Sequence, residues 1–259
     1  MLITAYVISI VGVILLPIIL WIIFTRQFVL SWKLVLAGGL TFIASQIPHI
    51  PLVLGLNGIL KSMPLLVNAI VLGLLAGIFE ETARYILFTF ILKKSRSWQE
   101  GILVGLGHGG MEALLIGISV AATVANMIAY RNVNLSTVSS IPPEQLELAK
   151  QQVSAFWSSA PYMALITLLE RVFAMCLHIN LSVMVLYAVA YQKPAWFWLA
   201  VLWHTLVDAT AVYMGQTIGA LQVEGLIAIF ALISIWVVFI MRTKSSETKT
   251  ISKSDQATV

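Results

Sequence analysis

The chain has 259 residues, of which 60% are hydrophobic and only 10% carry a charge. Its mean hydropathy is +0.97. Soluble domains carry about 25% charged residues, so this composition excludes a soluble globular domain and predicts an integral membrane protein. The net charge of +4 requires no nucleic-acid partner, and the single Cys176 excludes both an internal disulfide and a cysteine-rich metal motif.

Seven apolar segments are long enough to cross a bilayer, which takes about 20 apolar residues in a helix. In chain order they cover 3–24, 33–56, 65–92, 101–129, 155–191, 195–215 and 224–242. Because the runs are continuously apolar and do not alternate with a period of two, they favour an all-α transmembrane bundle over a β-barrel. The first run starts at Leu2 without a basic stretch before it, so we interpret it as a retained span rather than a signal peptide.

Two of these segments have more than one interpretation, so the expected number of spans is about seven, within a range of six to eight. The second contains Pro48 and Pro51, where a break into a re-entrant or interfacial piece is one interpretation. The fifth is long enough to begin as an interfacial helix. The polar loop at about 131–154 precedes it and is expected to carry a short surface helix.

Basic residues predict the orientation of the spans. With the N-terminus outside, ten of the 15 lysines and arginines fall in cytoplasmic loops and the C-terminal tail, and three fall in outer loops. This distribution follows the positive-inside rule and predicts a cytoplasmic C-terminus. We expect one integral membrane domain over 1–243, with the core of the site in 65–215, and a disordered cytoplasmic tail over 244–259.

The third segment carries two adjacent carboxylates, Glu80 and Glu81, followed by Arg84. A charge at the bilayer centre costs about 2.5–3.5 kcal/mol on insertion scales, so such residues persist where they pair, face a cavity or do chemistry. Residues three and four positions apart share a helix face, so Arg84 can reach either carboxylate. One arginine neutralises only one charge, which favours a chemical role for this group over a structural ion pair.

The fourth and sixth segments each place a histidine one helical turn before a carboxylate. These pairs are His108 with Glu112, in a glycine-rich run, and His204 with Asp208. A carboxylate that accepts a hydrogen bond from one ring nitrogen fixes the tautomer and leaves the other nitrogen to act. The alternative is a pair of structural hydrogen bonds at helix contacts.

The fifth segment adds Glu170, Arg171 and His178, and the last segment opens with Glu224. Arg171 and His178 are two turns apart on one helix face. We interpret the fifth-segment residues as a supporting polar seam. Glu224 is expected at the membrane interface.

Together these groups predict a polar site inside the membrane in which histidines and carboxylates activate a water and stabilise an oxyanion. No cofactor is expected. Zinc is the alternative, because histidines and carboxylates also ligate this ion, although the chain lacks a His-Glu-x-x-His motif. If a metal is present, its expected ligands are Glu80, Glu81, His108, His204 and Asp208.

The motifs resemble the superfamily of CAAX prenyl proteases, bacteriocin-processing enzymes and PrsW proteases, and most closely its YhfC branch. The resemblance covers about 70–215 and is carried by Phe79-Glu80-Glu81-Thr82-Ala83-Arg84, Gly107-His108-Gly109-Gly110-Met111-Glu112 and His204-Thr205-Leu206-Val207-Asp208. It implies a glutamic-type intramembrane endopeptidase of a bacterial plasma membrane. One glutamate of the pair would activate water with His108, while His204 and Asp208 would stabilise the oxyanion.

Two departures leave parts of this mechanism open. The arginine follows the first glutamate by four positions where CAAX proteases have five, so either glutamate could be the base. The last motif ends in Asp208 where those enzymes often have asparagine, which keeps a metalloprotease open. The expected substrate is a membrane-embedded or membrane-adjacent protein or peptide. A proton or cation transporter and a non-catalytic membrane scaffold are the alternatives.

Overall fold

The computed structural model describes residues 1–137 and 142–256. In this part of the chain seven helices are long and apolar enough to cross a membrane. They are α1 (Leu2–Phe28), α2 (Lys33–Gly55), α4 (Leu65–Ile86) with its π-helical extension η1 (Leu87–Ile91), α5 (Trp98–Tyr130), α7 (Pro161–Ala190), α8 (Ala195–Thr217) and α9 (Ala220–Gln256). The described residues contain no strand. The all-α transmembrane architecture with about seven spans is therefore confirmed.

The short elements lie in the connections between the spans. They are α3 (Asn57–Ser62), η2 (Leu135–Thr137), η3 (Pro143–Gln145) and α6 (Leu146–Ser158). The fifth apolar segment divides into α6 and α7, because Ser159 and Ala160 are extended and Pro161 then starts a new helix. Helix α6 contains no buried residue. It is the surface helix expected before this span.

Two predicted boundaries differ from the structure. Helix α2 continues through Pro48 and Pro51 to Gly55, so the proposed break is not seen. Membrane helices tolerate proline where neighbouring groups satisfy the freed backbone. Helix α9 continues as a helix beyond the apolar part that ends at Arg242. Disorder of the tail over 244–259 stays a prediction, because helical geometry does not test mobility, and 257–259 lie outside the described residues.

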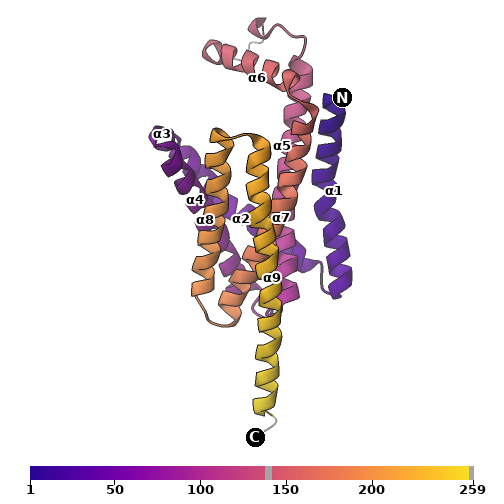
Figure 1. The fold of residues 1–259 in the computed structure, drawn as a ribbon, viewed down its shortest axis with the longest axis vertical. Helices are drawn as coiled ribbons and strands as arrows, with labels where there is room; N and C mark the ends of the chain where they lie inside the picture. Colours follow the sequence, from indigo (N-terminus) through magenta and orange to yellow (C-terminus); the bar gives the residue numbers. More distant parts are fainter. Residues whose placement is uncertain (138–141, 257–259) are drawn as a thin grey trace.

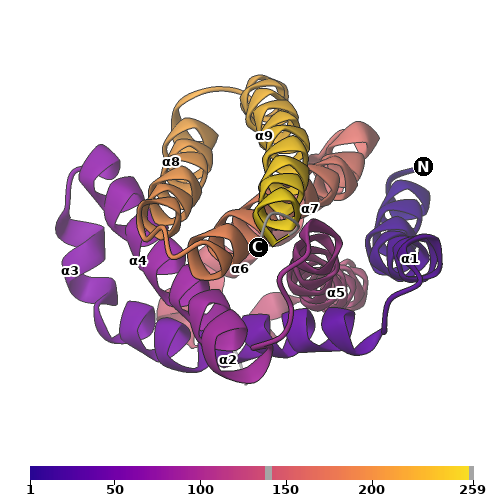
Figure 2. The ribbon, with the colours of Figure 1, turned by 90° about the horizontal axis from the view of Figure 1, so that it is seen from below.

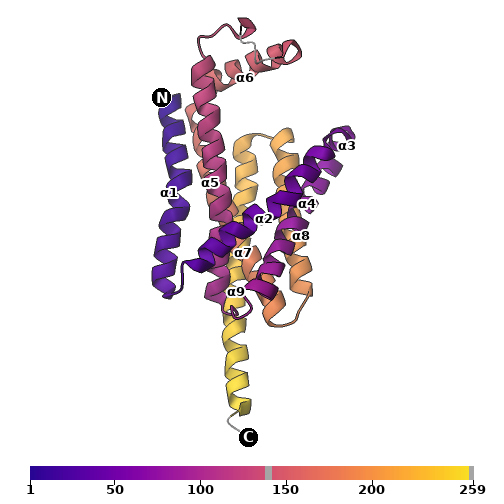
Figure 3. The same cartoon turned by 180° about the vertical axis from the view of Figure 1, so that it is seen from behind.

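The spans form one bundle around α7 (Figures 1 and 2). Helix α7 contacts α1, α4, α5, α8 and α9, while α1 lies at the outer edge against α5 and α7. Helix α2 runs obliquely across α5 and α4 (Figure 3). The N-terminus and α6 lie at one end of the bundle and the C-terminus at the other, as an odd number of spans requires. Which end faces the cytoplasm stays a prediction.

Glycines allow the backbones of the site helices to approach closely. A Cβ atom at Gly77 of α4 would lie 2.9 Å from the Val201 carbonyl oxygen of α8. One at Gly105 of α5 would lie 2.7 Å from the His178 carbonyl oxygen of α7. Small residues at helix contacts are typical of membrane bundles. These contacts bring polar side chains of α4, α5, α7 and α8 together.

Candidate active site

The polar residues from the four site helices meet in one connected network. Glu80, Glu81 and Arg84 come from α4, His108 and Glu112 from α5, Glu170, Arg171 and His178 from α7, and His204 and Asp208 from α8. Hydrogen bonds and ion pairs join all ten side chains. The juxtaposition that the sequence predicted for three separate motifs is thus present. The fifth-segment residues belong to the same network.

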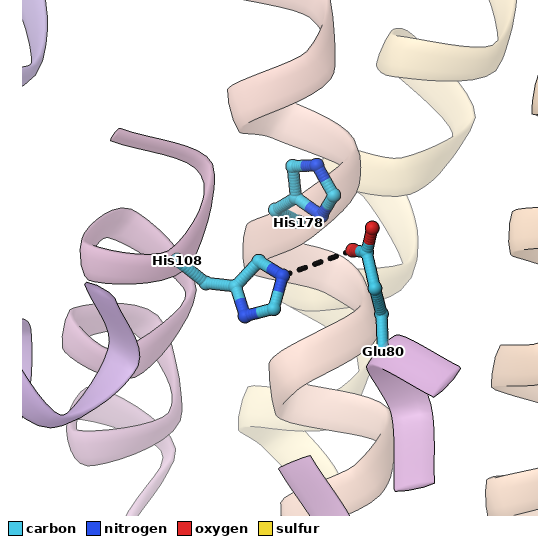
Figure 4. Close-up of side chains that lie close together, drawn as sticks. All are labelled: Glu80, His108 and His178. Atoms are coloured by element: carbon cyan, nitrogen blue, oxygen red, sulfur yellow. Dashed lines mark hydrogen bonds and ion pairs between the residues drawn. The ribbon is translucent and has the colours of Figure 1, made fainter. Parts of the chain in front are cut away.

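Glu80 is one of the carboxylates of this network that line the cavity described below. Its Oε2 accepts a hydrogen bond from His108 Nε2 at 2.9 Å, and its Oε1 accepts one from Gln46 Nε2 at 3.1 Å. Gln46 in turn accepts from His49 Nδ1 at 3.0 Å. Figure 4 shows the Glu80 carboxylate directed toward the rings of His108 and His178. Both carboxylate oxygens are therefore oriented by neighbouring helices.

Glu81 has a different environment, although it is the next residue. It is fully buried, and its Oε1 accepts from Arg84 Nη1 and from His204 Nδ1, the latter at 2.8 Å. Arg84 is also fully buried, and its Nη2 lies 3.7 Å from Glu80 Oε2. Glu81 does not line the cavity. The two glutamates thus separate into one at the cavity wall and one inside the packed bundle.

His178 lies at the centre of the network. Arg84 Nη2 is 2.7 Å from its Nδ1, and Glu112 Oε2 is 2.6 Å from its Nε2. A guanidinium only donates, so Nδ1 accepts and the ring proton lies on Nε2, which donates to Glu112. The rings of His108 and His204 lie 5.1 Å and 5.7 Å from that of His178. His178 thus stands between the other two histidines.

Two further ion pairs extend the network along α7 and α8. Arg171 donates to Glu112 at 2.7 Å and to Glu170 at 2.5 Å. His204 Nε2 lies 3.4 Å from Asp208 Oδ2. Glu170 and Asp208 are 44% and 35% exposed, whereas Arg171 is 8% exposed. The more exposed members of the network therefore lie toward the cavity.

A cavity of about 330 Å³ adjoins the network. Its walls come mainly from α7, α8 and α9, and α8 and α9 lie on the same side of α7 (Figure 2). Charged and polar side chains form part of the lining, and the rest of the wall is apolar. The polar members are Glu80, Glu112, Glu170, Arg171, His178, His204, Asp208 and Glu224. Gly215 also lines it, so the cavity reaches toward the turn between α8 and α9. Its volume is in the range of small-molecule and peptide side-chain pockets.

Among the described residues, one group has the ligand atoms and spacing for a metal ion. Glu80, His108 and His178 offer ligand atoms that all lie within 4.8 Å of one another, and all three are buried. Two imidazoles and one carboxylate match the ligand types of catalytic zinc sites. His178 also donates its Nε2 proton to Glu112, which is the outer carboxylate contact typical of metal-bound histidines. The donor set therefore fits zinc.

This group differs from the ligand set expected from the sequence. Glu80 and His108 belong to it, but the third member is His178 rather than Glu81, His204 or Asp208. Those three form their own chain of contacts, from Glu81 to His204 and on to Asp208. The spacing within one helix shows which residues share a face, but it does not show which helices face each other.

The sequence interpretation missed Gln46 and gave His178 only a supporting role. Gln46 is uncharged and lies two residues before a proline, so nothing in its local pattern marked it. His178 has a stronger signal, because it lies seven residues after Arg171 in an apolar span and hence on the same helix face.

Comparison with known proteins agrees with the architecture. Residues 12–231 match the family described as YhfC intramembrane metalloprotease. The chain is 32% identical over 244 residues to the "Uncharacterized membrane protein YhfC" of Bacillus subtilis (strain 168), covering 86% of this chain and 90% of that protein. No solved structure matches the chain. It is a multi-pass bacterial membrane protein, and it belongs to the YhfC family.

Proposed function

We propose that the protein is an intramembrane peptidase that hydrolyses a peptide bond of a membrane-embedded or membrane-adjacent protein. The observation that carries the proposal is the buried Glu80–His108 pair at the wall of a 330 Å³ cavity, inside a bundle of membrane-spanning helices. The description of the family as an intramembrane metalloprotease supports the same reaction class.

Glu80 is the general base in this proposal. It removes a proton from a water molecule in the cavity, and the water oxygen attacks the peptide carbonyl carbon. The C–N bond then breaks while the proton passes to the leaving nitrogen, which gives one new carboxyl and one new amino terminus. His108 and Gln46 hold the two carboxylate oxygens in place, so Glu80 does not have to reorganise during the reaction.

His204 is the donor that we assign to the oxyanion. Its Nδ1 is fixed by Glu81 at 2.8 Å, and its Nε2 points to the cavity side near Asp208. Because Nδ1–H donates to Glu81, Nε2 donates to the oxyanion in the imidazolium form of the ring, which the flanking carboxylates of Glu81 and Asp208 stabilise. Glu81 and Arg84 are positioning residues, because they hold His204 and His178 but do not line the cavity.

The metal form of the same site would use Glu80, His108 and His178 as ligands. A zinc ion there would act as a Lewis acid on the carbonyl oxygen or on water. His178 Nδ1 would then exchange the hydrogen bond from Arg84 for the metal. The charge balance of the site favours a bound cation. The ten-residue network contains five carboxylates, three histidines and only two guanidiniums.

The proposal is tested by mapping protein termini in membranes of a bacterial host that expresses the protein. With the wild type we expect new N-termini within or next to transmembrane segments, and we expect none of these with Glu80→Gln. Glu147→Gln is the matched control, because Glu147 lies exposed on α6 and its one ion pair among the described residues is with Lys150. Identical termini with wild type and Glu80→Gln, at equal protein levels, would contradict the proposal.

A further inference from the structure

Glu224, near the start of α9, lies in the cavity wall. It is only 7% exposed. Its expected position at the membrane interface stays a prediction. Its Oε2 has no hydrogen-bond partner among the described residues. A buried carboxylate without a partner is costly, because its charge has lost water and gained nothing in return. Such a group is expected to gain its partner from outside the chain.

The other four carboxylates that line the cavity already have partners. The pairs are Glu80 with His108, Glu112 and Glu170 with Arg171, and Asp208 with His204. Five carboxylates thus line the cavity against one guanidinium, that of Arg171. Negative charge in a cavity with low-dielectric walls attracts cations.

We propose that Glu224 binds a positively charged side chain, lysine or arginine, of the peptide substrate. This inference rests on the proposed peptidase function and adds the substrate class. The carboxylate lies on the path between the α8–α9 turn and Glu80, because Gly215, Ala220 and Glu224 line the same cavity as Glu80. A peptide that reaches Glu80 from this end passes Glu224.

A metal ion is a poorer occupant of this position than a basic side chain. Metal sites in proteins use three or more ligands. Glu170, which lines the same cavity, is already engaged by Arg171 and is not free to be a second ligand. Among the described residues, the one group with metal-site spacing is Glu80, His108 and His178, which does not include Glu224. A flexible ammonium or guanidinium group needs only the single free carboxylate.

The test uses purified full-length protein in liposomes with synthetic transmembrane peptides. The peptides differ only by lysine, glutamine or glutamate at one position within five residues of the cleaved bond, which mass spectrometry locates. We expect the lysine peptide to be cleaved about tenfold faster than the glutamine peptide, as a charge-assisted hydrogen bond would give. In Glu224→Gln this ratio should fall to about one, and Glu224→Lys should favour the glutamate peptide. Glu147→Gln should keep the wild-type ratio.

Binding of the same peptides to Glu80→Gln protein separates this inference from the peptidase proposal. A lysine preference in binding, without cleavage by the wild type, supports the Glu224 site and contradicts the peptidase. Cleavage and binding that are equal for all three peptides contradict the Glu224 site and leave the peptidase intact. A lysine preference that persists in Glu224→Gln also overturns the inference.

Discussion

Replacement of Arg84 by methionine should destabilise the protein more than any exposed charge change. Arg84 is fully buried, donates to Glu81 and His178, and lies 3.7 Å from Glu80. In Arg84→Met the fully buried Glu81 keeps His204 as its hydrogen-bond partner but loses its guanidinium. Removal of one member of a buried pair costs about 3–5 kcal/mol, because the other charge stays in a low-dielectric site.

The double variant Glu81→Gln/Arg84→Met tests the reason for this cost. It removes both charges, and replacement of a whole buried pair is often close to neutral. The lost hydrogen bond to His178 costs about 1.5–3 kcal/mol. We therefore expect the double variant to be more stable than Arg84→Met alone, although the double variant carries more changes.

The free energy of unfolding of the four proteins in this cycle can be measured by SDS titration in mixed micelles. Arg131→Met is the matched control, because Arg131 is exposed and lies over the ring of Trp157 at 4.2 Å. Its cost should stay at about 1 kcal/mol or less. A double variant that is as unstable as Arg84→Met, or more so, would refute the buried-charge argument.

Two further predictions concern glycines. Gly107→Ala places a Cβ atom against the Val35 carbonyl of α2, so we expect its free energy of unfolding to fall by about 1–3 kcal/mol in the same titration. Gly58→Ala is the control and should be neutral, because a Cβ atom there has nothing within 4 Å. Equal stability of the two variants would contradict the packing argument. Gly215 lines the cavity near the α8–α9 turn, and a Cβ atom there would meet nothing within 4 Å. We therefore expect Gly215→Leu to narrow the cavity and to lower cleavage about tenfold or more at unchanged stability. Gly225→Leu, where a Cβ atom is equally free but which does not line the cavity, should cleave normally. Unchanged cleavage by Gly215→Leu would exclude this route for the substrate.

The sequence was sufficient for the spans and for the three motifs of the site. Continuous apolar runs of about 20 residues predict membrane helices directly, and i, i+4 spacing predicts which polar residues share a helix face. The resemblance predicts that one glutamate of the pair acts with His108, and helix geometry predicts that Arg84 reaches either glutamate. The spans and the i, i+4 pairs depend on single helices, and the meeting of the three motifs depends on the helix arrangement that the resemblance implies.

The sequence was not sufficient where two helices had to be oriented against each other. Glu80 and Glu81 are neighbours in the chain, but they point 100° apart around α4, so they meet different partners. His178 became central because α7 passes between α5 and α8, which no spacing within α7 reveals. The start of an apolar run marks Glu224 in the sequence, but its place in the cavity wall depends on how α9 packs against α7 and α8, which its local pattern does not reveal.

The central claim is that Glu80 reacts while Glu81 positions its neighbours. The most direct test is the rate of peptide cleavage in liposomes by Glu80→Gln and Glu81→Gln, each normalised to folded protein. We predict that Glu80→Gln keeps its stability and loses all cleavage, because it removes the base at the cavity wall. We predict that Glu81→Gln loses stability and keeps residual cleavage, because it weakens the hold on Arg84 and His204. Cleavage retained by Glu80→Gln and abolished in folded Glu81→Gln would contradict the account.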